Sequence, residues 1–298
     1  MTSLFDDLRS NREMRHSMSS ISKRTRIAGA AVLAALTLGL TACAPPGESN
    51  GAAAPAEDGE GLGTIRVGAL PTPAGDILEF VQDNLAEEAG LSIEFVPFTD
   101  YNTPNTSLDE GSTDANLFQN ATFLDTFNEA SGSDLVSVGE IYLPTGAYYS
   151  NKVEDLADLP DGASIAVPND PTNEGRALKI LAAEGLITTT DEPTTLGDIT
   201  DNPSGFEFIE IENASLPQAV ADSDAAFVTL TFALPAGLTS EEAILIEGED
   251  SSYYNILATT PELESDPRIV ALKELLLSEE TQQFINDTWG GLVVPAAG

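Results

Sequence analysis

Histidine and cysteine are almost absent from this 298-residue chain. The single histidine is His16 and the single cysteine is Cys43, so the rest of the chain has neither an imidazole nor a thiol. Ser-His-Asp and Cys-His catalysis are excluded beyond Cys43, as are zinc and iron sites built from histidine or cysteine ligands. Only carboxylate, lysine or hydroxyl chemistry remains, and we expect no catalytic residue, no metal and no cofactor.

Positive charge is the second scarce property. The chain has 12 Lys and Arg against 49 Asp and Glu, which gives a formal net charge of −37. Half of the basic residues precede Cys43, so six of them remain in the rest of the chain against 46 acidic residues. Such an excess repels nucleic acid and anionic membrane surfaces, and we expect neither as a direct partner. The simplest interpretation of the acidic excess is a strongly hydrated acidic surface.

The basic residues that precede Cys43 are followed directly by an uncharged stretch, residues 27–42. A basic segment followed by a short apolar one is the layout of a secretory signal. Sixteen residues fall short of the roughly 20 that span a bilayer. The ending Leu40-Thr41-Ala42-Cys43 resembles a lipobox, whose cysteine receives diacylglycerol. The sequence therefore predicts a lipoprotein signal peptide at residues 1–42 and lipidation of Cys43. A transmembrane anchor with a chance cysteine is the alternative.

The chain beyond Cys43 divides into a linker and an α/β region. Residues 43–63 are small, acidic or proline residues with almost no large apolar side chain, which predicts a flexible tether. From Thr64 onwards, strand-like and helix-like patterns alternate, which predicts mainly parallel sheets covered by helices. Strands are expected at 64–70, 91–98, 115–118, 135–143, 163–167, 206–211, 225–228, 244–247 and 254–258. Helices are expected at 74–89, 105–111, 120–130, 172–184, 216–221 and twice between 266 and 289.

Residues 166–178 are the stretch that most clearly indicates a ligand-binding site. A strand is expected to end at Val167, and a helix to begin after a turn, with Thr172 as its N-cap. Ligands of open α/β sheets bind at such places, beyond the carboxyl ends of strands. Arg176 follows in the first helical turns, where its guanidinium can hold a carboxylate through two parallel hydrogen bonds. An ion pair with one of the many acidic side chains is the alternative role for Arg176.

The same stretch resembles a sequence block of the methionine-binding lipoprotein family (MetQ/NlpA type), the substrate-binding components of ABC importers. The family block V-P-N-D-P-x-N-x-x-R-x-L is matched by Val167 to Leu178. Further matches keep their order over roughly residues 64–290. They include Ile65-Arg66-Val67-Gly68, Phe98-Thr99-Asp100-Tyr101, Pro104-Asn105, Asp114-Ala115-Asn116, Phe118-Gln119, Val138-Gly139, Leu216-Pro217 and Ser252-Tyr253 with Asn255.

The resemblance implies a two-lobe, periplasmic-binding-protein-like fold (type II) with a ligand cleft between the lobes. Lobe I would comprise residues 64–147 and 250–298, and lobe II residues 148–249. Arg176 would take the ligand's α-carboxylate and Asn255 another polar end, while aromatic residues enclose the ligand side chain. The complete set of expected ligand-binding residues is Tyr101, Phe118, Asn120, Phe123, Asn169, Arg176, Thr229 and Asn255.

Three of these positions depart from the family pattern. Asn120 stands where a histidine is usual, Phe123 where a tyrosine is usual and Thr229 where an asparagine is usual. An amino-acid ligand is therefore a safer expectation than methionine itself.

The function that the resemblance implies is binding without catalysis. A monomer anchored by lipid on the outer face of the cell membrane would capture a small amino acid and deliver it to an ABC permease. Two alternatives come from other classes. One is an extracellular hydrolase that uses carboxylates, and the other is a scaffold or adhesion lipoprotein with no transport role.

Because of the lipobox and the unpaired cysteine, we predict that the mature protein begins at a lipidated Cys43. Two or three acyl chains would give stable anchoring where one would not. Mass spectrometry of the membrane fraction should identify acylated Cys43 as the first residue. A soluble product that retains Ala42, or a product cleaved elsewhere, would contradict this prediction.

Overall fold

The structure is a computed structural model that describes residues 61–248 and 251–297. The predicted signal peptide, Cys43 and nearly all of the predicted tether lie outside the described residues. Within the described ranges, no helix combines the length and the apolar character needed to cross a membrane.

The first of two large sheets is mixed and has the strand order β13-β4-β12-β3-β1-β2. β1 pairs in parallel with β2 and β3, whereas β12 runs antiparallel to both β3 and β4, and β13 antiparallel to β4. Its strands are β1 (Gly63–Ala69), β2 (Leu91–Pro97), β3 (Ala115–Asn120), β4 (Val136–Pro144), β12 (Asn255–Thr259) and β13 (Val293–Pro295).

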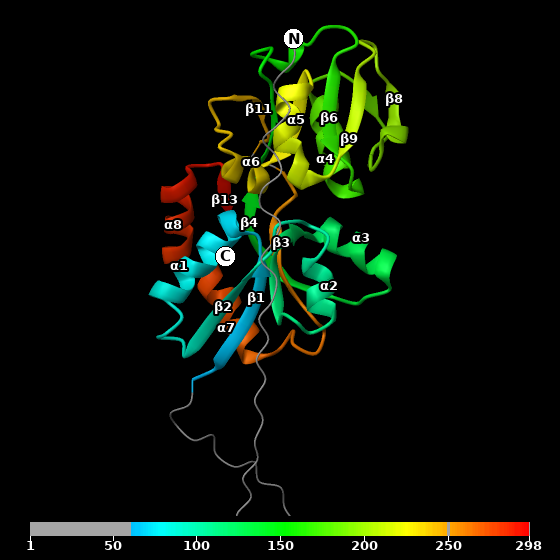
Figure 1. Cartoon of the computed structure of the whole chain (residues 1–298). Helices are drawn as coiled ribbons and strands as arrows, with labels where there is room; N and C mark the ends of the chain where they lie inside the picture. The colour runs from blue at the N-terminus through cyan, green and yellow to red at the C-terminus, as the bar shows by residue number, and fades with distance from the viewer. Residues whose placement is uncertain (1–60, 249–250, 298) are drawn as a thin grey trace, which may run out of the picture. The chain divides into compact units, whose positions relative to one another are not determined.

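Helices cover both faces of this sheet (Figure 1). One face packs against α1 (Asp76–Asn84), α7 (Pro267–Leu276) and α8 (Glu279–Trp289), and the other against α2 (Pro104–Asp109) and α3 (Ala121–Ser131). Successive residues of β12 point to opposite faces. Leu257 accordingly joins the core under α1, α7 and α8, whereas Ile256 and Ala258 join the core under α2 and α3. Burial on both faces fixes the register of this central strand.

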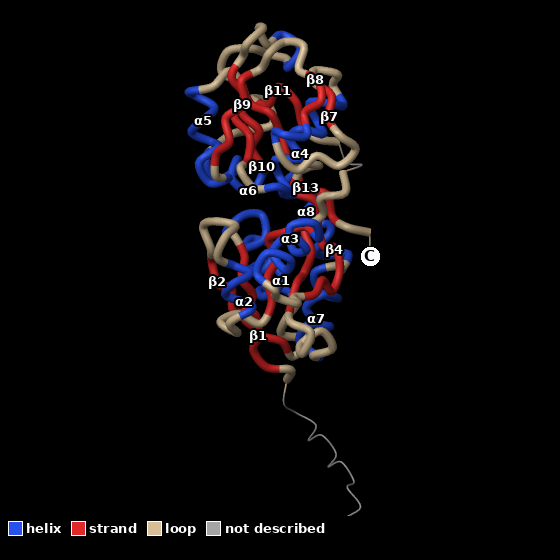
Figure 2. The backbone as a smooth tube through the Cα atoms, turned by 90° about the vertical axis from the view of Figure 1, so that its right-hand side faces the viewer, coloured by secondary structure: helices blue, strands red, loops and turns tan. Residues whose placement is uncertain are grey.

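The second large sheet has the strand order β11-β5-β10-β6-β9. Its strands are β5 (Gly146–Tyr149), β6 (Ser164–Pro168), β9 (Glu207–Ile211), β10 (Ala225–Thr229) and β11 (Ala243–Ile246). Helices α4 (Pro171–Ala183) and α5 (Leu216–Asp222) lie on opposite sides of it (Figure 2). Phe227 packs in the core on the α4 side and Val228 in the core on the α5 side, as the alternation of a strand requires.

Shorter elements complete the described part of the chain. Helix α6 (Leu230–Ala236) follows β10, and β7 (Thr188–Thr189) pairs with β8 (Ile199–Asp201) as a separate ribbon. A π-helical turn (Pro71–Gly75) precedes α1, and 3₁₀ turns lie at Leu156–Asp158, Leu196–Asp198 and Asn213–Ser215.

The chain passes between the two sheets twice within residues 61–297. The first crossing lies between Pro144, the end of β4, and Gly146, the start of β5, and the second between Ile246 and Asn255. β5 thus begins in the second sheet two residues before the predicted start of lobe II at residue 148. The remaining lobe limits stay a prediction. A Cβ atom on Gly146 would lie 2.3 Å from the ring of Phe227, so this crossing requires glycine.

The α/β fold predicted from the sequence is confirmed, but the expected strand direction and the end of one helix were wrong, and several short elements were not predicted. The sheets are mixed rather than mainly parallel. β5 is the first strand after the chain crosses into the second sheet, and β12 is the first after it returns to the first sheet, and each is antiparallel to its neighbours. The helix expected at 74–89 ends at Asn84, where the N–H of Ala86 bonds to the carbonyl of Val81 and widens the turn. Strands β5 and β13 and helix α6 were not predicted as elements of their own.

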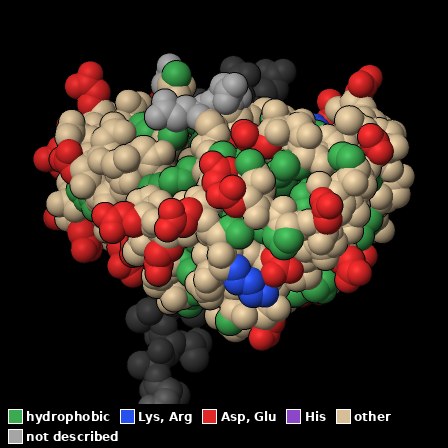
Figure 3. Space-filling model, turned by 90° about the horizontal axis from the view of Figure 1, so that it is seen from above, with side chains coloured by type: hydrophobic (Ala, Val, Ile, Leu, Met, Phe, Trp, Pro, Cys, Tyr) green, Lys and Arg blue, Asp and Glu red, His purple; other side chains and the backbone are tan. Residues whose placement is uncertain are grey.

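Five of the six basic residues beyond Cys43 form ion pairs within the described part of the chain. Only the pair of Arg176 with Glu247 is buried, with side chains 3% and 7% exposed. The other pairs are more exposed, and acidic side chains dominate the face shown in Figure 3. Most carboxylates therefore have no cationic partner. Unneutralised carboxylates hydrate the surface strongly and repel one another.

Asp224 joins β10 to β6 and provides a test of the second sheet. Its carboxylate accepts hydrogen bonds from the Ser164 N–H and hydroxyl, both at 2.8 Å, and from Lys152 Nζ at 2.9 Å. The backbone N–H of Ser164, and next the Lys152 ammonium, lower the pKa of Asp224 from 3.8 to about 2.

We expect Asp224→Asn to lower the free energy of unfolding by about 1–2 kcal/mol at pH 7. Because the folded pKa lies below the unfolded one, this stabilisation is complete above pH ~4 and is lost as the pH falls towards ~2. Urea unfolding between pH 7 and 3 should show the variant approaching the wild type. Asp222→Asn, at an exposed position of α5, is the control and should change stability little. A difference between wild type and Asp224→Asn that is independent of pH would refute this explanation.

Candidate functional site

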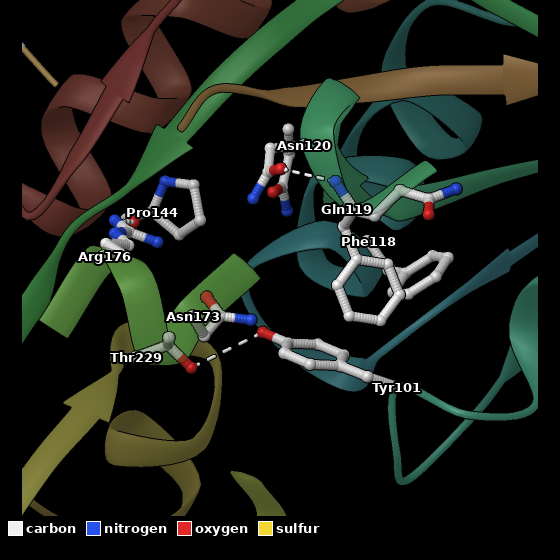
Figure 4. Close-up of a pocket in the computed structure, with 10 residues that line it drawn as sticks. Tyr101, Phe118, Gln119, Asn120, Pro144, Asn173, Arg176 and Thr229 are labelled. Atoms are coloured by element: carbon white, nitrogen blue, oxygen red, sulfur yellow. Dashed lines mark hydrogen bonds between the residues drawn. The ribbon is translucent and has the colours of Figure 1, made fainter. Parts of the chain in front are cut away.

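One pocket lies where the carboxyl ends of strands from both sheets meet. β3 ends in it at Asn120 and β10 at Thr229, and α4, which follows β6, supplies Arg176. Open α/β sheets place ligands at such strand ends. The pocket is narrow, with a cavity volume of about 10 Å³, and is lined by Tyr101, Phe118, Gln119, Asn120, Phe123, Pro144, Asn173, Arg176, Thr229 and Asn255 (Figure 4). Seven of the eight residues predicted from the sequence are therefore brought together.

Aromatic rings form one wall of the pocket. The ring of Tyr101 lies 5.7 Å from that of Phe118 and 5.9 Å from that of Phe123, centroid to centroid. Phe232 of α6 packs edge-on against Tyr101 with ring centroids 4.8 Å apart. Helix α6, which follows the second sheet's β10, therefore contacts this aromatic wall. The Tyr101 hydroxyl lies 3.4 Å from Thr229 Oγ1 across the pocket. Burial raises the pKa of Tyr101, which therefore remains a neutral hydroxyl.

Asparagine side chains form the polar part of the pocket. Asn120 caps α3 by accepting the N–H of Phe123 at 3.0 Å, Asn173 donates Nδ2 to Asp170, and Asn255 donates Nδ2 to the hydroxyl of Tyr142. These bonds fix the orientation of each amide. Among the described residues, nothing bonds to Asn120 Nδ2, Asn173 Oδ1 or Asn255 Oδ1, so one donor and two acceptors are available to a ligand.

A buried network of amides holds β3 against α2 behind the pocket. Asn105 and Gln119 exchange two hydrogen bonds of 2.7 Å, and Asn116 donates to Asn105 at 2.9 Å. All three side chains are at most 3% exposed. Because each is bonded to another, the network has a single arrangement and fixes the strand that carries Phe118 and Asn120.

Arg176 is engaged within the protein along one edge of its guanidinium. Nε lies 2.9 Å and 3.1 Å from the two carboxylate oxygens of Glu247, Nη2 also bonds to Glu247, and Nη2 donates to the carbonyl of Pro144 at 2.8 Å. The ring of Tyr253 lies 4.8 Å from the guanidinium carbon. The internal ion pair, weighed as an alternative from the sequence, is thus present. Only Nη1 has no partner among the described residues, so Arg176 offers a ligand one nitrogen and not a two-nitrogen fork.

The start of α4 differs from the prediction in two ways. The N-cap is Asp170 and not Thr172, because Pro171 begins the helix and the Asp170 carboxylate accepts the N–H of Asn173 at 2.9 Å. Asn169 does not line the pocket. Its N–H continues the pairing of β6 with β9 by bonding to the carbonyl of Ile211, and its side chain is exposed.

Three pocket-lining residues and one supporting residue were not predicted. Asn173 occupies the second asparagine position of the V-P-N-D-P-x-N block, and Gln119 follows Phe118 in another matched motif, so a signal for both was present. Pro144 enters the pocket only through the position of the first crossing. Glu247 is one acidic residue among many, and no local pattern singles it out.

The pocket presents groups that suit the binding of a small polar ligand. Its ten lining residues include one cation, four amide side chains and no carboxylate. Within residues 61–248 and 251–297, no cluster of three or more His, Cys, Asp or Glu could hold a metal ion. The available groups match an amino acid: Nη1 of Arg176 suits a carboxylate, the two amide oxygens suit an ammonium, and the aromatic wall suits an apolar side chain.

Comparison with known proteins supports the resemblance predicted from the sequence. A family model described as NlpA lipoprotein matches residues 65–297. The D-methionine-binding lipoprotein MetQ of Salmonella typhi is 36% identical over 234 residues, which are 76% of this chain and 86% of the relative.

Solved structures of similar proteins support the same resemblance. A periplasmic substrate-binding protein of an ABC transporter from Coxiella burnetii is 36% identical with a TM-score of 0.75, covering 78% of this chain and 100% of that one. A nutrient-binding protein from Burkholderia cenocepacia, bound to methionine, is 35% identical with the same TM-score, covering 78% and 99%. The expected two-lobe fold of periplasmic binding proteins is thereby confirmed. The chain belongs to the NlpA lipoprotein family.

Proposed function

We propose that this protein is a lipid-anchored solute-binding protein on the outer face of the cell membrane. It captures a small amino acid, methionine or a close relative, and delivers it to an ABC permease, without changing the ligand chemically. It acts as a monomer and requires no cofactor.

The observation that carries the proposal is the division of the pocket into an aromatic wall and a polar side. Tyr101, Phe118 and Phe123 form an aromatic wall against which an apolar or thioether side chain packs when the pocket opens, since sulfur contacts the edges of aromatic rings favourably. Arg176, Asn173 and Asn255 line the same pocket, and each keeps one polar atom without a partner among the described residues: Nη1, Oδ1 and Oδ1. A zwitterion with an apolar side chain satisfies both sides at once.

The names of the relatives support the same ligand class. Relatives include D-methionine-binding lipoproteins, and one solved structure is a nutrient-binding protein bound to methionine. The differences at Asn120, Phe123 and Thr229 all lie in the pocket, so we keep the ligand class as an amino acid with methionine as its leading member.

Groups from both sheets enclose the pocket, which supports capture by closure. Tyr101 lies beside the first sheet and meets Thr229, the last residue of β10 in the second sheet, and Phe232 of the following helix α6. A ligand held between these groups is shielded from water, and release requires the two halves to separate. Such closure around a ligand is the motion of periplasmic binding proteins in general.

The two alternative functions have less support. A carboxylate-based hydrolase needs a pair of acidic groups at the substrate, and no carboxylate lines this pocket. A scaffold lipoprotein gives no reason for unpaired polar atoms around a buried aromatic wall, since such atoms cost free energy when they have no partner.

We expect Arg176→Lys to weaken the binding of L-methionine at least about tenfold, measured by isothermal titration calorimetry. A single ammonium cannot bond to Glu247, the carbonyl of Pro144 and a ligand carboxylate in the geometry of the guanidinium. Lysine is preferable to alanine here, because removing the cation would leave Glu247 buried and unpaired, which destabilises a protein by about 3–5 kcal/mol.

The matched control is Arg268→Lys, which alters an arginine that pairs with Asp266 and does not line the pocket. It should bind methionine like the wild type. Wild-type protein that binds no amino acid would overturn the proposed function. Normal affinity in a folded Arg176→Lys variant would overturn the role of Arg176.

A further inference from the structure

We propose that Glu247 is a positioning residue for ligand binding: it orients Arg176 so that Nη1 faces the pocket, and it ties together the two crossings between the sheets. The inference rests on the proposed function, since it concerns how the arginine of that pocket is prepared for a carboxylate.

Four hydrogen-bond donors converge on the Glu247 carboxylate. Nε and Nη2 of Arg176 reach it from α4, the Gly146 N–H lies 2.9 Å from Oε2, and the Ser251 hydroxyl lies 2.8 Å from Oε1. The Glu247 N–H in turn donates to the carbonyl of Gly146 at 2.8 Å. Every group around the carboxylate is a donor, so only a side chain that accepts through both oxygens satisfies them all.

The two donors that do not belong to Arg176 come from the segments that connect the two sheets. Gly146 lies in the first crossing, and Glu247 and Ser251 lie in the second. The bonds to Glu247 therefore join the two crossings to each other and to helix α4. Since Gly146 has no Cβ, its backbone can approach this position where any other residue would collide with Phe227.

The guanidinium of Arg176 is restrained on three sides. Glu247 holds the Nε–Nη2 edge, the carbonyl of Pro144 accepts from Nη2, and the ring of Tyr253 lies against one face. The remaining nitrogen, Nη1, belongs to a residue that lines the pocket, whereas Glu247 does not line it. Glu247 thus acts on the ligand only through Arg176. Burial of the pair, at 3% and 7% exposure, keeps water from replacing these contacts.

The substitution Glu247→Gln tests the inference because it preserves size and replaces one acceptor by a donor. Both Glu247 oxygens accept from Arg176, so in either orientation the new amide N–H₂ faces an Arg176 donor and the guanidinium has to rotate away. We expect affinity for L-methionine to fall about 10–100-fold, the usual effect of removing a group that orients a ligand-contacting residue. Glu247→Asp keeps both acceptors on a shorter side chain and should recover part of the loss.

A double-mutant cycle separates positioning from a general structural effect. L-methionine is titrated calorimetrically into wild type, Glu247→Gln, Arg176→Lys and the double variant, and each is checked by its melting curve. If Glu247 acts through Arg176, the double variant binds about as well as Arg176→Lys alone. If the two residues act independently, their losses multiply. Glu242→Gln, which alters an exposed glutamate that caps the neighbouring turn, is the control and should bind normally.

The outcomes are distinct. Multiplying losses, or normal methionine affinity in folded Glu247→Gln, would overturn the positioning role and leave the proposed function standing. If Glu247→Gln does not fold, Glu247→Asp takes its place in the cycle with the same criteria. Absence of amino-acid binding by the wild type would overturn the proposed function, and this inference with it.

Discussion

The buried ion pair between Arg176 and Glu247 is the contact on which the pocket and both crossings depend. It joins α4 of the second sheet to the segment that returns to the first sheet, and its neighbours Gly146 and Ser251 belong to the two crossings. Burying two charges is expensive, and a pair repays this cost only if further hydrogen bonds satisfy the remaining atoms. Here the backbone N–H of Gly146, the Ser251 hydroxyl and the Pro144 carbonyl provide those bonds.

The acidic composition makes this buried ion pair unusual among the ion pairs of the protein. With six basic residues in the chain beyond Cys43, each cation has many carboxylates to choose from, and most of the resulting pairs lie at the surface, where they contribute little. Arg176 differs because it is enclosed between the sheets, where a ligand carboxylate gains from a low dielectric environment.

The sequence predicted most of the elements and seven of the ten residues that line the pocket, because periodicity and the matched blocks are local signals. The antiparallel entry of β12 and β5 escaped prediction, since strand direction depends on where a distant segment returns. The partner of Arg176 escaped for a similar reason: Glu247 lies 71 residues away and has no distinguishing neighbours. The N-cap was misassigned because Pro171 at the first helical position moves the cap back to Asp170.

Native mass spectrometry of protein purified without refolding tests most directly whether the pocket between the two sheets holds an amino acid. The account predicts a retained ligand whose mass is that of methionine or a related amino acid, which is displaced by added L-methionine and unchanged after long incubation. Protein that carries no ligand and acquires none from a mixture of amino acids would contradict it, as would a bound amino acid that is converted into a product of different mass.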